Sequence, residues 1–169
     1  GKSHVLHGVN LNMFGKRDPS QYGTATLADI DAALLSLAQD LDVTVECFQT
    51  NHEGEMVERI HKVMDEDIQA LVINAGAWTH YSYSIADALA ILPVPKVEVH
   101  MSNVHAREAF RHHSVLSPVC AGSVCGFGVE SYLLGLRAAQ SLGATRAQLI
   151  RHVILPSALP DILTGIRIG

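Results

Sequence analysis

Residues 69–74 (Gln-Ala-Leu-Val-Ile-Asn) are the stretch that most clearly indicates the fold. Four apolar residues follow one another here without alternation, and a polar asparagine ends the run. A continuous apolar run is typical of a strand in a parallel sheet, because helices cover both faces of such a sheet. The sequence therefore predicts a buried strand at this place.

Strand patterns alternate with helix patterns on both sides of this run. Short β-rich apolar runs predict strands, and apolar residues that recur every three or four positions predict helices. The predicted strands are residues 4–9, 43–48, 69–74, 96–100 and 118–124, and the predicted helices are residues 27–41, 53–64, 82–92 and one that starts near residue 129. The alternation predicts an α/β protein with a flavodoxin-like, five-stranded parallel sheet and helices on both faces.

The composition is that of an ordinary globular domain, with 48% hydrophobic residues in a chain of 169. Its 12 basic and 17 acidic side chains give a net charge of −5, which argues against nucleic acid or a membrane surface as a partner. No apolar run approaches the roughly 18–20 residues that a membrane span needs. Three cysteines without a C-x-x-C motif argue against a disulfide framework, so we expect a cytoplasmic protein.

The charge balance changes near the C-terminus. Residues 137–169 contain four arginines and one aspartate, whereas acidic side chains predominate before them. A shift of this kind marks a candidate boundary. We therefore predict a flavodoxin-type domain at residues 1–138 and a helical C-terminal extension at residues 139–169.

Polar side chains follow four of the predicted strands. Ligands of parallel α/β sheets bind outside the carboxyl ends of the strands, so polar residues in four such loops favour a binding site over plain solvated loops. The loop at residues 10–24 is long and contains two glycines and a proline, as expected of a lid. The candidate site residues are Asn10, Arg17, Tyr22, Asn74, His80, His100, Ser102, Arg107 and Arg111.

Tyr22 and Arg17 are the most informative pair among these residues. A free tyrosine has a pKa of about 10 and is therefore a poor base at neutral pH. A neighbouring arginine favours the phenolate, which can remove a proton from the carbon next to a carbonyl. Asn10, or a water that it holds, would then stabilise the enolate. His100 could protonate a departing hydroxyl, and Glu98 would share its strand face. From the residues alone, a plain turn position is the slightly simpler interpretation of Tyr22.

Other catalytic and cofactor patterns are missing from the sequence. There is no H-x-x-x-H pair, no cysteine close to a histidine, no P-loop and no nucleophile elbow. The glycines at residues 126 and 128 fit a tight turn between a strand and a helix. We therefore expect neither a metal nor a cofactor.

Five sequence blocks resemble the type II 3-dehydroquinate dehydratase family. They occur in the order found in the family and span about residues 3–138. The blocks are residues 10–23 (NLNMFGKRDPSQYG), 49–55 (QTNHEGE), 74–80 (NAGAWTH), 97–114 (VEVHMSNVHAREAFRHHS), and 121–137 with its Gly126-Phe-Gly128 turn.

The resemblance implies a lyase with a flavodoxin-like subunit, assembled as a homododecamer of four trimers. The implied reaction is the anti elimination of water from 3-dehydroquinate, through an enolate, to 3-dehydroshikimate. It needs no metal and no cofactor. The reaction serves the shikimate pathway and aromatic amino acid biosynthesis, or quinate breakdown.

The resemblance also assigns catalytic roles by matching position. Tyr22 is the base, and Arg17 on the lid sets its charge state. Asn10 orients the water that stabilises the enolate. His100 is the acid that releases water, and Glu98 supports it.

The remaining implied roles concern substrate binding. Asn74, His80 and Arg111 bind substrate hydroxyls, while the backbone of Met101 and Ser102, with the Ser102 hydroxyl, takes the carboxylate. In addition, Asp87 reaches a neighbouring subunit's site, and Arg107 lies near the lid.

Four positions depart from the family pattern. His7 and Val9 stand where the family usually has Asn and Pro, and loss of the proline loosens the turn that aims Asn10. Trp78 and Tyr81 are larger than the residues common at their positions. We expect these changes to affect turnover and the fit of the lid.

The C-terminal segment resembles a different family. Residues 138–143 and 153–156 have the spacing of the cytoplasmic coupling loop of ABC-transporter permeases, and residues 149, 150, 153 and 154 form a short apolar stripe. Two other functions compete with the enzyme as interpretations of the sequence. One is a non-catalytic binding module on the same fold, which would not need Tyr22. The other is an interaction protein whose tail binds a nucleotide-binding subunit.

Overall fold

The core of the structure is a five-stranded sheet in the order β2-β1-β3-β4-β5. The computed structural model describes residues 1–151 and 156. All four strand pairs are parallel, so the predicted flavodoxin-like sheet is confirmed. The strands are β1 (Lys2–His7), β2 (Thr44–Gln49), β3 (Ala70–Asn74), β4 (Lys96–His100) and β5 (Gly122–Cys125).

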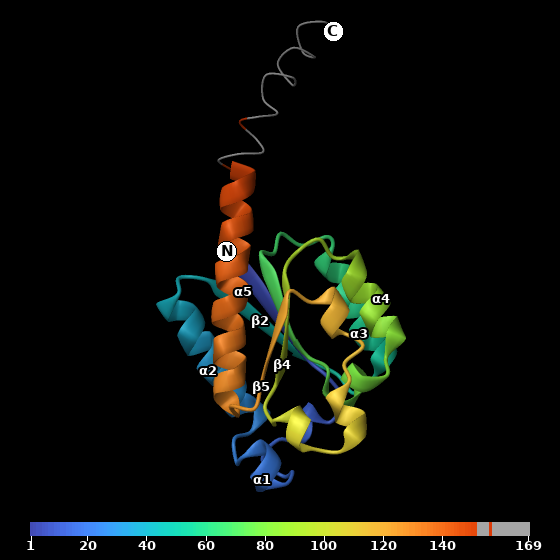
Figure 1. The fold of residues 1–169 in the computed structure, drawn as a ribbon. Coiled ribbons are helices and arrows are strands. Elements are labelled where there is room, and N and C mark those ends of the chain that lie inside the picture. Colours follow the sequence, from blue (N-terminus) through green and yellow to red (C-terminus); the bar gives the residue numbers. More distant parts are fainter. Residues whose placement is uncertain (152–155, 157–169) are drawn as a thin grey trace, which may run out of the picture.

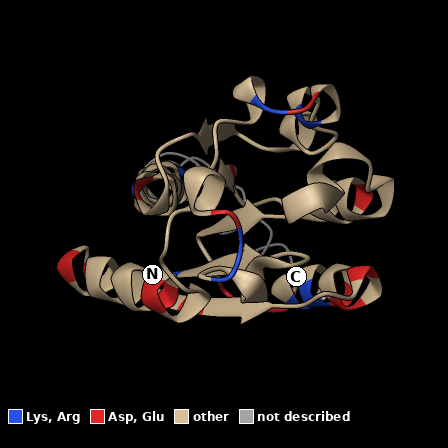
Figure 2. Cartoon of the chain, turned by 90° about the horizontal axis from the view of Figure 1, so that it is seen from below, with Lys and Arg blue, Asp and Glu red and all other residues tan. Residues whose placement is uncertain are grey.

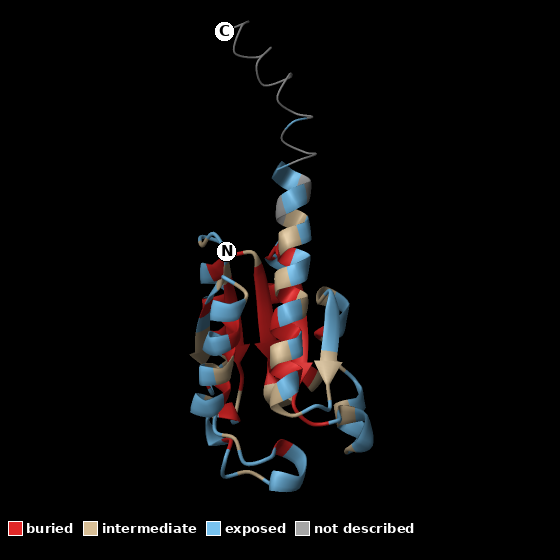
Figure 3. Cartoon of the chain, turned by 90° about the vertical axis from the view of Figure 1, so that its left-hand side faces the viewer, coloured by how far each residue is buried: buried red, intermediate tan, exposed pale blue. Residues whose placement is uncertain are grey.

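Helices cover both faces of the sheet (Figure 1). One face packs against α2 (Leu27–Asp40) and α5 (Val129–Leu149), and the other against α3 (Glu53–Val63) and α4 (Tyr83–Ile91). Seen from the side of α2 and α5, the buried strands lie behind this helical layer (Figure 3). The short helices are α1 (Pro19–Tyr22), η1 (Leu11–Met13), η2 (Gly76–His80), η3 (Val104–Ala106), η4 (Ala109–His112) and η5 (Ser117–Val119).

Side-chain caps explain where several helices begin. The Thr26 hydroxyl accepts from the Asp29 amide, and the Asp29 carboxylate accepts from the Thr26 amide, which is a reciprocal capping box. Ser82 caps α4 by a single bond, in which its hydroxyl accepts from the Ile85 amide. The central strands β3 and β4 are buried at every residue, as the QALVIN run predicts.

Two predicted strands are corrected by the structure. The segment predicted at residues 118–124 begins as the 3-10 helix η5, and the strand covers only Gly122–Cys125. Pro118 explains this, because its fixed φ suits the start of a helical turn and it has no amide hydrogen for a strand ladder. The strand predicted at residues 4–9 ends at His7, since Asn10 already has a left-handed backbone with φ 68°.

The helix α5 runs without a break across the predicted domain boundary at residues 138 and 139. Ala139 is fully buried in the core, so the sheet still packs against the helix there. The last turns extend beyond the sheet on the side opposite α1 (Figure 1). The tail residues 152–155 and 157–169 lie outside the described part of the chain, and the role of residues 139–169 stays a prediction. Within residues 1–151 and 156, no helix combines the length and apolar character needed to cross a bilayer.

Close packing of α5 on the sheet depends on Gly135. A Cβ atom at this position would lie 2.5 Å from Cγ2 of Val99, a fully buried residue of β4. Gly135→Ala should therefore lower the free energy of unfolding by about 1–3 kcal/mol, because the core is overpacked. Urea denaturation at a fixed protein concentration measures this.

Gly54→Ala is the matched control for that measurement. Gly54 lies in α3, and a Cβ there meets nothing within 4 Å. This change should leave stability equal or raise it by about 0.4–1 kcal/mol, since alanine restricts the unfolded chain. Equal effects of the two substitutions would contradict the packing argument.

Candidate active site

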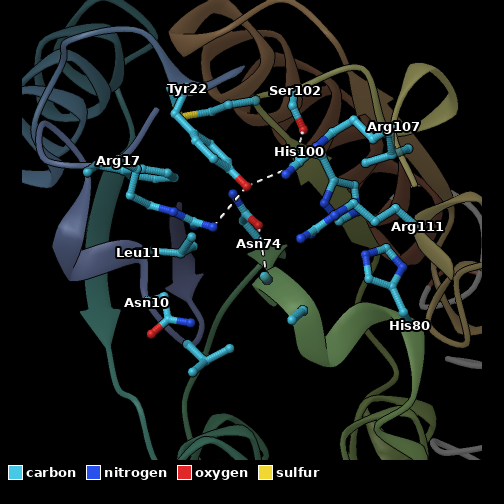
Figure 4. Close-up of a pocket in the computed structure, with 16 residues that line it drawn as sticks. Asn10, Leu11, Arg17, Tyr22, Asn74, His80, His100, Ser102, Arg107 and Arg111 are labelled. Carbon is cyan, nitrogen blue, oxygen red and sulfur yellow. Dashed lines mark hydrogen bonds between the residues drawn. The ribbon is translucent and has the colours of Figure 1, made fainter. Parts of the chain in front are cut away.

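A pocket lies at the carboxyl ends of β1, β3 and β4, where the loops carry the predicted polar residues (Figure 4). Basic segments occur in the loops at this edge of the sheet (Figure 2), against the negative net charge of the whole chain. Ten predicted site residues line the pocket: Asn10, Arg17, Tyr22, Asn74, His80, His100, Met101, Ser102, Arg107 and Arg111.

The phenol oxygen of Tyr22 receives hydrogen bonds from two arginines. Nη2 of Arg17 lies 2.9 Å from it and Nη1 of Arg107 lies 2.7 Å from it (Figure 4). The Arg17 guanidinium also lies over the tyrosine ring, 3.9 Å from its centroid. Two cationic donors on one oxygen stabilise a negative charge there.

Local sequence explains how Tyr22 reaches this place. Asp18 caps α1 by accepting from the amide and hydroxyl of Ser20, and these hydrogen bonds hold the pKa of Asp18 below its usual range. Pro19 occupies the first helical position, where its missing amide hydrogen costs nothing. The buried ring of Tyr22 packs against Phe14, with centroids 5.7 Å apart. The segment predicted to be a lid is therefore an ordered turn that directs the Tyr22 side chain inward.

Arg107 contacts Tyr22 directly, whereas the sequence predicts only that it lies near the lid. The same Nη1 atom that meets Tyr22 donates to the Ser102 hydroxyl at 3.0 Å. Its Nε is buried and has no hydrogen-bond partner among the described residues. The sequence analysis missed the direct contact with Tyr22, because the two residues are 85 positions apart.

His100 and Glu98 form the predicted pair on one face of β4. Nε2 of His100 lies 2.6 Å from Oε2 of Glu98, so Nδ1 is the nitrogen available to a substrate. The other carboxylate oxygen accepts from Ser114 at 2.8 Å and Ser117 at 3.0 Å. Burial raises the pKa of Glu98, but the hydrogen bonds from His100, Ser114 and Ser117 outweigh it and hold the pKa below its ordinary value. Glu98 is therefore an anion that orients the imidazole from outside the pocket.

Hydrogen bonds to neighbouring backbone and side-chain groups hold the two asparagines of the pocket. The Asn74 amide oxygen accepts from the Gly76 amide at 3.2 Å, while its nitrogen donates to Tyr132 at 3.0 Å. The Asn10 backbone amide donates to the Asn51 side chain at 2.8 Å. Gln49 donates to the same Asn51 oxygen and to the Gly8 carbonyl, so side chains hold the turn that lacks the usual proline.

His80 and Arg111 close the remaining side of the pocket. His80 Nδ1 donates to the backbone oxygen of His113 at 2.8 Å, and its ring stacks on His100 with centroids 6.3 Å apart. The Arg111 guanidinium is held by Glu108. Burial lowers the pKa of His80, the bond to His113 opposes this, and the charges of His100 and Arg111 lower it further.

Comparisons with known proteins identify the family of the chain. A family model described as dehydroquinase class II matches residues 1–140. The chain belongs to this family. A 3-dehydroquinate dehydratase from Syntrophotalea carbinolica is 67% identical over 138 residues, which make up 82% of this chain and 93% of that protein. One from Leptothrix cholodnii is 65% identical over 138 residues, with the same coverage.

Solved structures of class II dehydroquinases share the fold. The crystal structure of the type II dehydroquinase from Butyrivibrio crossotus superimposes with a TM-score of 0.81 at 39% identity. The match covers 82% of this chain and 97% of that one. The resemblance of the C-terminal segment to a permease coupling loop lies mostly beyond the part matched by the dehydroquinase family, and these comparisons lend it no support.

Several predicted positions lie outside the pocket of this dehydroquinase-family chain. Asp87 is exposed on α4. Trp78 is buried in the core beside α3 and α4, and Tyr81 is exposed. Val9 lines the pocket, whereas His7 is 1% exposed and packs behind it.

Two clusters in the described residues bring three metal-type ligand atoms within 4.8 Å of one another. His4, Glu46 and Glu66 form one, and His7, Asp31 and Cys47 form the other. Neither cluster lines the pocket. The pocket residues supply amides, hydroxyls, guanidinium groups and imidazoles, which suit proton transfer and anion binding.

The lowered pKa of His80 predicts a pH dependence of stability. The unfolded chain takes up this proton near pH 6.5, about the ordinary histidine value, whereas the folded chain takes it up only at lower pH. The unfolded state therefore binds more protons in that window, and stability falls as the pH falls. In urea denaturation between pH 7 and pH 5, His80→Gln should lose less unfolding free energy than the unmodified chain.

The matched control is His61→Gln, an exposed histidine on α3. This variant should keep the pH slope of the unmodified chain. A steeper loss of stability in His80→Gln than in the unmodified chain would contradict the burial argument.

Proposed function

We propose that this chain eliminates water from 3-dehydroquinate in two proton-transfer steps carried by its own side chains. The observation that carries the proposal is the phenol oxygen of Tyr22 between the guanidinium groups of Arg17 and Arg107. The relatives named above as 3-dehydroquinate dehydratases support the choice of substrate.

In the first step, the Tyr22 phenolate takes the hydrogen next to the substrate ketone. The electron pair of the broken C–H bond moves to the ketone oxygen and makes an enolate. A water held by Asn10 donates to that oxygen. Arg17 and Arg107 both donate to the phenol oxygen, so they stabilise the negative charge that Tyr22 carries as the base.

In the second step, His100 protonates the departing hydroxyl. The enolate oxygen re-forms the ketone, and the electron pair of the enolate C=C bond forms the new double bond as the C–O bond breaks. The hydroxyl leaves as water with the proton that His100 supplies. Glu98 holds the imidazolium before this transfer, through the bond of 2.6 Å at Nε2. The product is a conjugated enone, and both side chains return to their starting protonation states through solvent.

The remaining pocket residues bind the substrate in this proposal. Asn74, His80 and Arg111 hold its hydroxyls, and Ser102 with the Met101 backbone takes its carboxylate. Arg107 contacts Ser102 as well as Tyr22. It therefore couples closure of the lid to occupation of the carboxylate site.

We also propose that the chain works in the cytoplasm as a homododecamer of four trimers. The exposed side of α4 supports contact with another copy, because Tyr83, Asp87 and Ile91 are one turn apart along it. Tyr83 is 72% exposed and Ile91 is 57% exposed, which is unusual for large apolar residues. Asp87 lies between them and would enter a neighbour's site.

Replacement of Tyr22 tests the base. Tyr22→Phe should lower kcat by about 10²–10⁴-fold, the range for loss of a general base, while a substrate analogue still binds. The assay follows the ultraviolet absorbance of the enone after 3-dehydroquinate is added. Gln39→Glu, at an exposed position of α2, is the control and should retain full activity.

A chelator arm accompanies the same assay. The rate should not change after dialysis against a chelator, because no proposed step uses a metal. An unchanged kcat in Tyr22→Phe would contradict the assignment of Tyr22 as the base. Binding without turnover in the unmodified chain would instead favour a non-catalytic binding module.

Sedimentation velocity tests the assembly. The unmodified chain should sediment as a dodecamer, and Tyr83→Glu should shift it to smaller species, since a charge would be buried at the contact. Gln39→Glu on the exposed side of α2 is the control and should sediment like the unmodified chain. A monomeric unmodified chain would contradict both the dodecamer and the role of Asp87.

A further inference from the structure

A buried chain of hydrogen bonds leads from Asn74 away from the pocket. The Asn74 side-chain nitrogen donates to the Tyr132 hydroxyl at 3.0 Å. That hydroxyl lies 2.9 Å from Nδ1 of His7, and Nε2 of His7 lies 2.8 Å from Oδ1 of Asp31. We call Asp31, His7 and Tyr132 the Asn74 relay; its members come from α2, β1 and α5.

The relay is enclosed at the pocket end and half-buried at the other. Tyr132 is 0% exposed, His7 1% and Asn74 3%, while Asp31 is half-buried. Polar groups at such depth need partners, because burial of an unsatisfied donor or acceptor is unfavourable. Each link therefore constrains the next one.

The directions of these hydrogen bonds can be worked out. The Gly76 amide donates to the Asn74 oxygen, which leaves the Asn74 nitrogen facing Tyr132. Burial raises the pKa of Tyr132, so its hydroxyl keeps its hydrogen. Since that oxygen accepts from Asn74, its one hydrogen goes to Nδ1 of His7.

His7 completes the sequence of donors. Because Nδ1 accepts from Tyr132, the imidazole hydrogen is on Nε2 and is donated to Asp31. Every donor then has an acceptor, with a neutral imidazole in a single tautomer. A carboxylate behind a histidine fixes the tautomer in this way.

The neighbouring thiol does not turn this end of the relay into a metal site. Ligand atoms of His7, Asp31 and Cys47 lie within 4.8 Å of one another. Both ring nitrogens of His7 already have partners, however. Burial and the Asp31 charge raise the pKa of Cys47 to about 12, so the thiol stays protonated and is a poor ligand.

We propose that Asp31, His7 and Tyr132 are positioning residues, which fix the Asn74 amide so that its second N–H is presented to a substrate hydroxyl. The proposal rests on the proposed function, in which Asn74 binds that hydroxyl. It also gives a role to His7, one of the departures from the family pattern. An imidazole reaches both Tyr132 and Asp31, and thereby connects the pocket to α2.

Removal of the Tyr132 hydroxyl tests the relay through turnover of 3-dehydroquinate. Tyr132→Phe should lower kcat/KM about tenfold or more, since the Asn74 nitrogen loses its buried acceptor. In an Asn74→Ala background the same change should have less than about a twofold effect, because Tyr132 acts through Asn74. Gln39→Glu, at an exposed position of α2, is the control and should be neutral. A full tenfold loss in the Asn74→Ala background would overturn the proposal.

A spectroscopic measurement tests the relay without using activity. The ¹⁵N spectrum of the unmodified protein should show His7 as a neutral imidazole with its hydrogen on Nε2. Asp31→Asn should change the His7 signals, whereas Asp40→Asn, at an exposed carboxylate of the same helix, should not. A hydrogen on Nδ1 in the unmodified protein would overturn the proposed direction of the relay.

The two measurements separate failure of this inference from failure of the proposed function. Absence of 3-dehydroquinate turnover in the unmodified chain refutes the proposed function, and with it the catalytic purpose of the relay. Normal turnover together with an Nδ1–H tautomer, or with independent effects of Tyr132 and Asn74, refutes the relay alone. Tyr132→Phe protein that does not fold leaves the tautomer measurement to decide.

Discussion

The structure of the pocket depends on one phenol oxygen held between two guanidinium groups. Arg17 reaches Tyr22 from within the lid, while Arg107 reaches it from the segment after β4. Both guanidinium groups donate to this oxygen, and its partial negative charge offsets the repulsion between the two cations. In the proposed mechanism, closure of the loop over the pocket and activation of the base are therefore one event.

The sheet supplies the rigid frame for that event. Asn74 ends β3, and His100 ends β4, so neighbouring parallel strands deliver both side chains to one edge. Glu98 is two residues before His100 and therefore shares its face of the strand. Behind this edge, Tyr132 from α5 hydrogen-bonds to Asn74 and His7. The geometry of the pocket is thus fixed by backbone register and by the buried side of α5.

The parts of this arrangement that depend on local pattern could be predicted from the sequence. Apolar runs located the strands, and their alternation with helices predicted a flavodoxin-like parallel sheet. The i, i+2 rule predicted that Glu98 and His100 share one face of a strand. The sequence did not predict that residues 118–124 divide into a 3-10 helix and a shorter strand, although Pro118 argues against a continuous strand. Strand ends were also misplaced where a left-handed residue, Asn10, begins the loop.

Contacts between distant segments could not be predicted in the same way. Arg107 and Tyr22 are 85 residues apart, and His7 and Tyr132 are 125 residues apart. Nothing in local hydrophobic periodicity shows that such residues meet, because their contact depends on how the loops and α5 pack. The family resemblance assigned Arg107 to the neighbourhood of the lid, but its bond to the phenol oxygen follows only from the three-dimensional structure.

The most direct test of this account is hydrogen exchange at the carbon next to the substrate ketone. ¹H NMR in D₂O would compare His100→Ala with Tyr22→Phe, using 3-dehydroquinate. Because Tyr22 acts first and His100 second, His100→Ala should exchange that hydrogen with solvent faster than it forms product. Tyr22→Phe should do neither. Exchange in Tyr22→Phe at the rate of the unmodified chain would contradict the account.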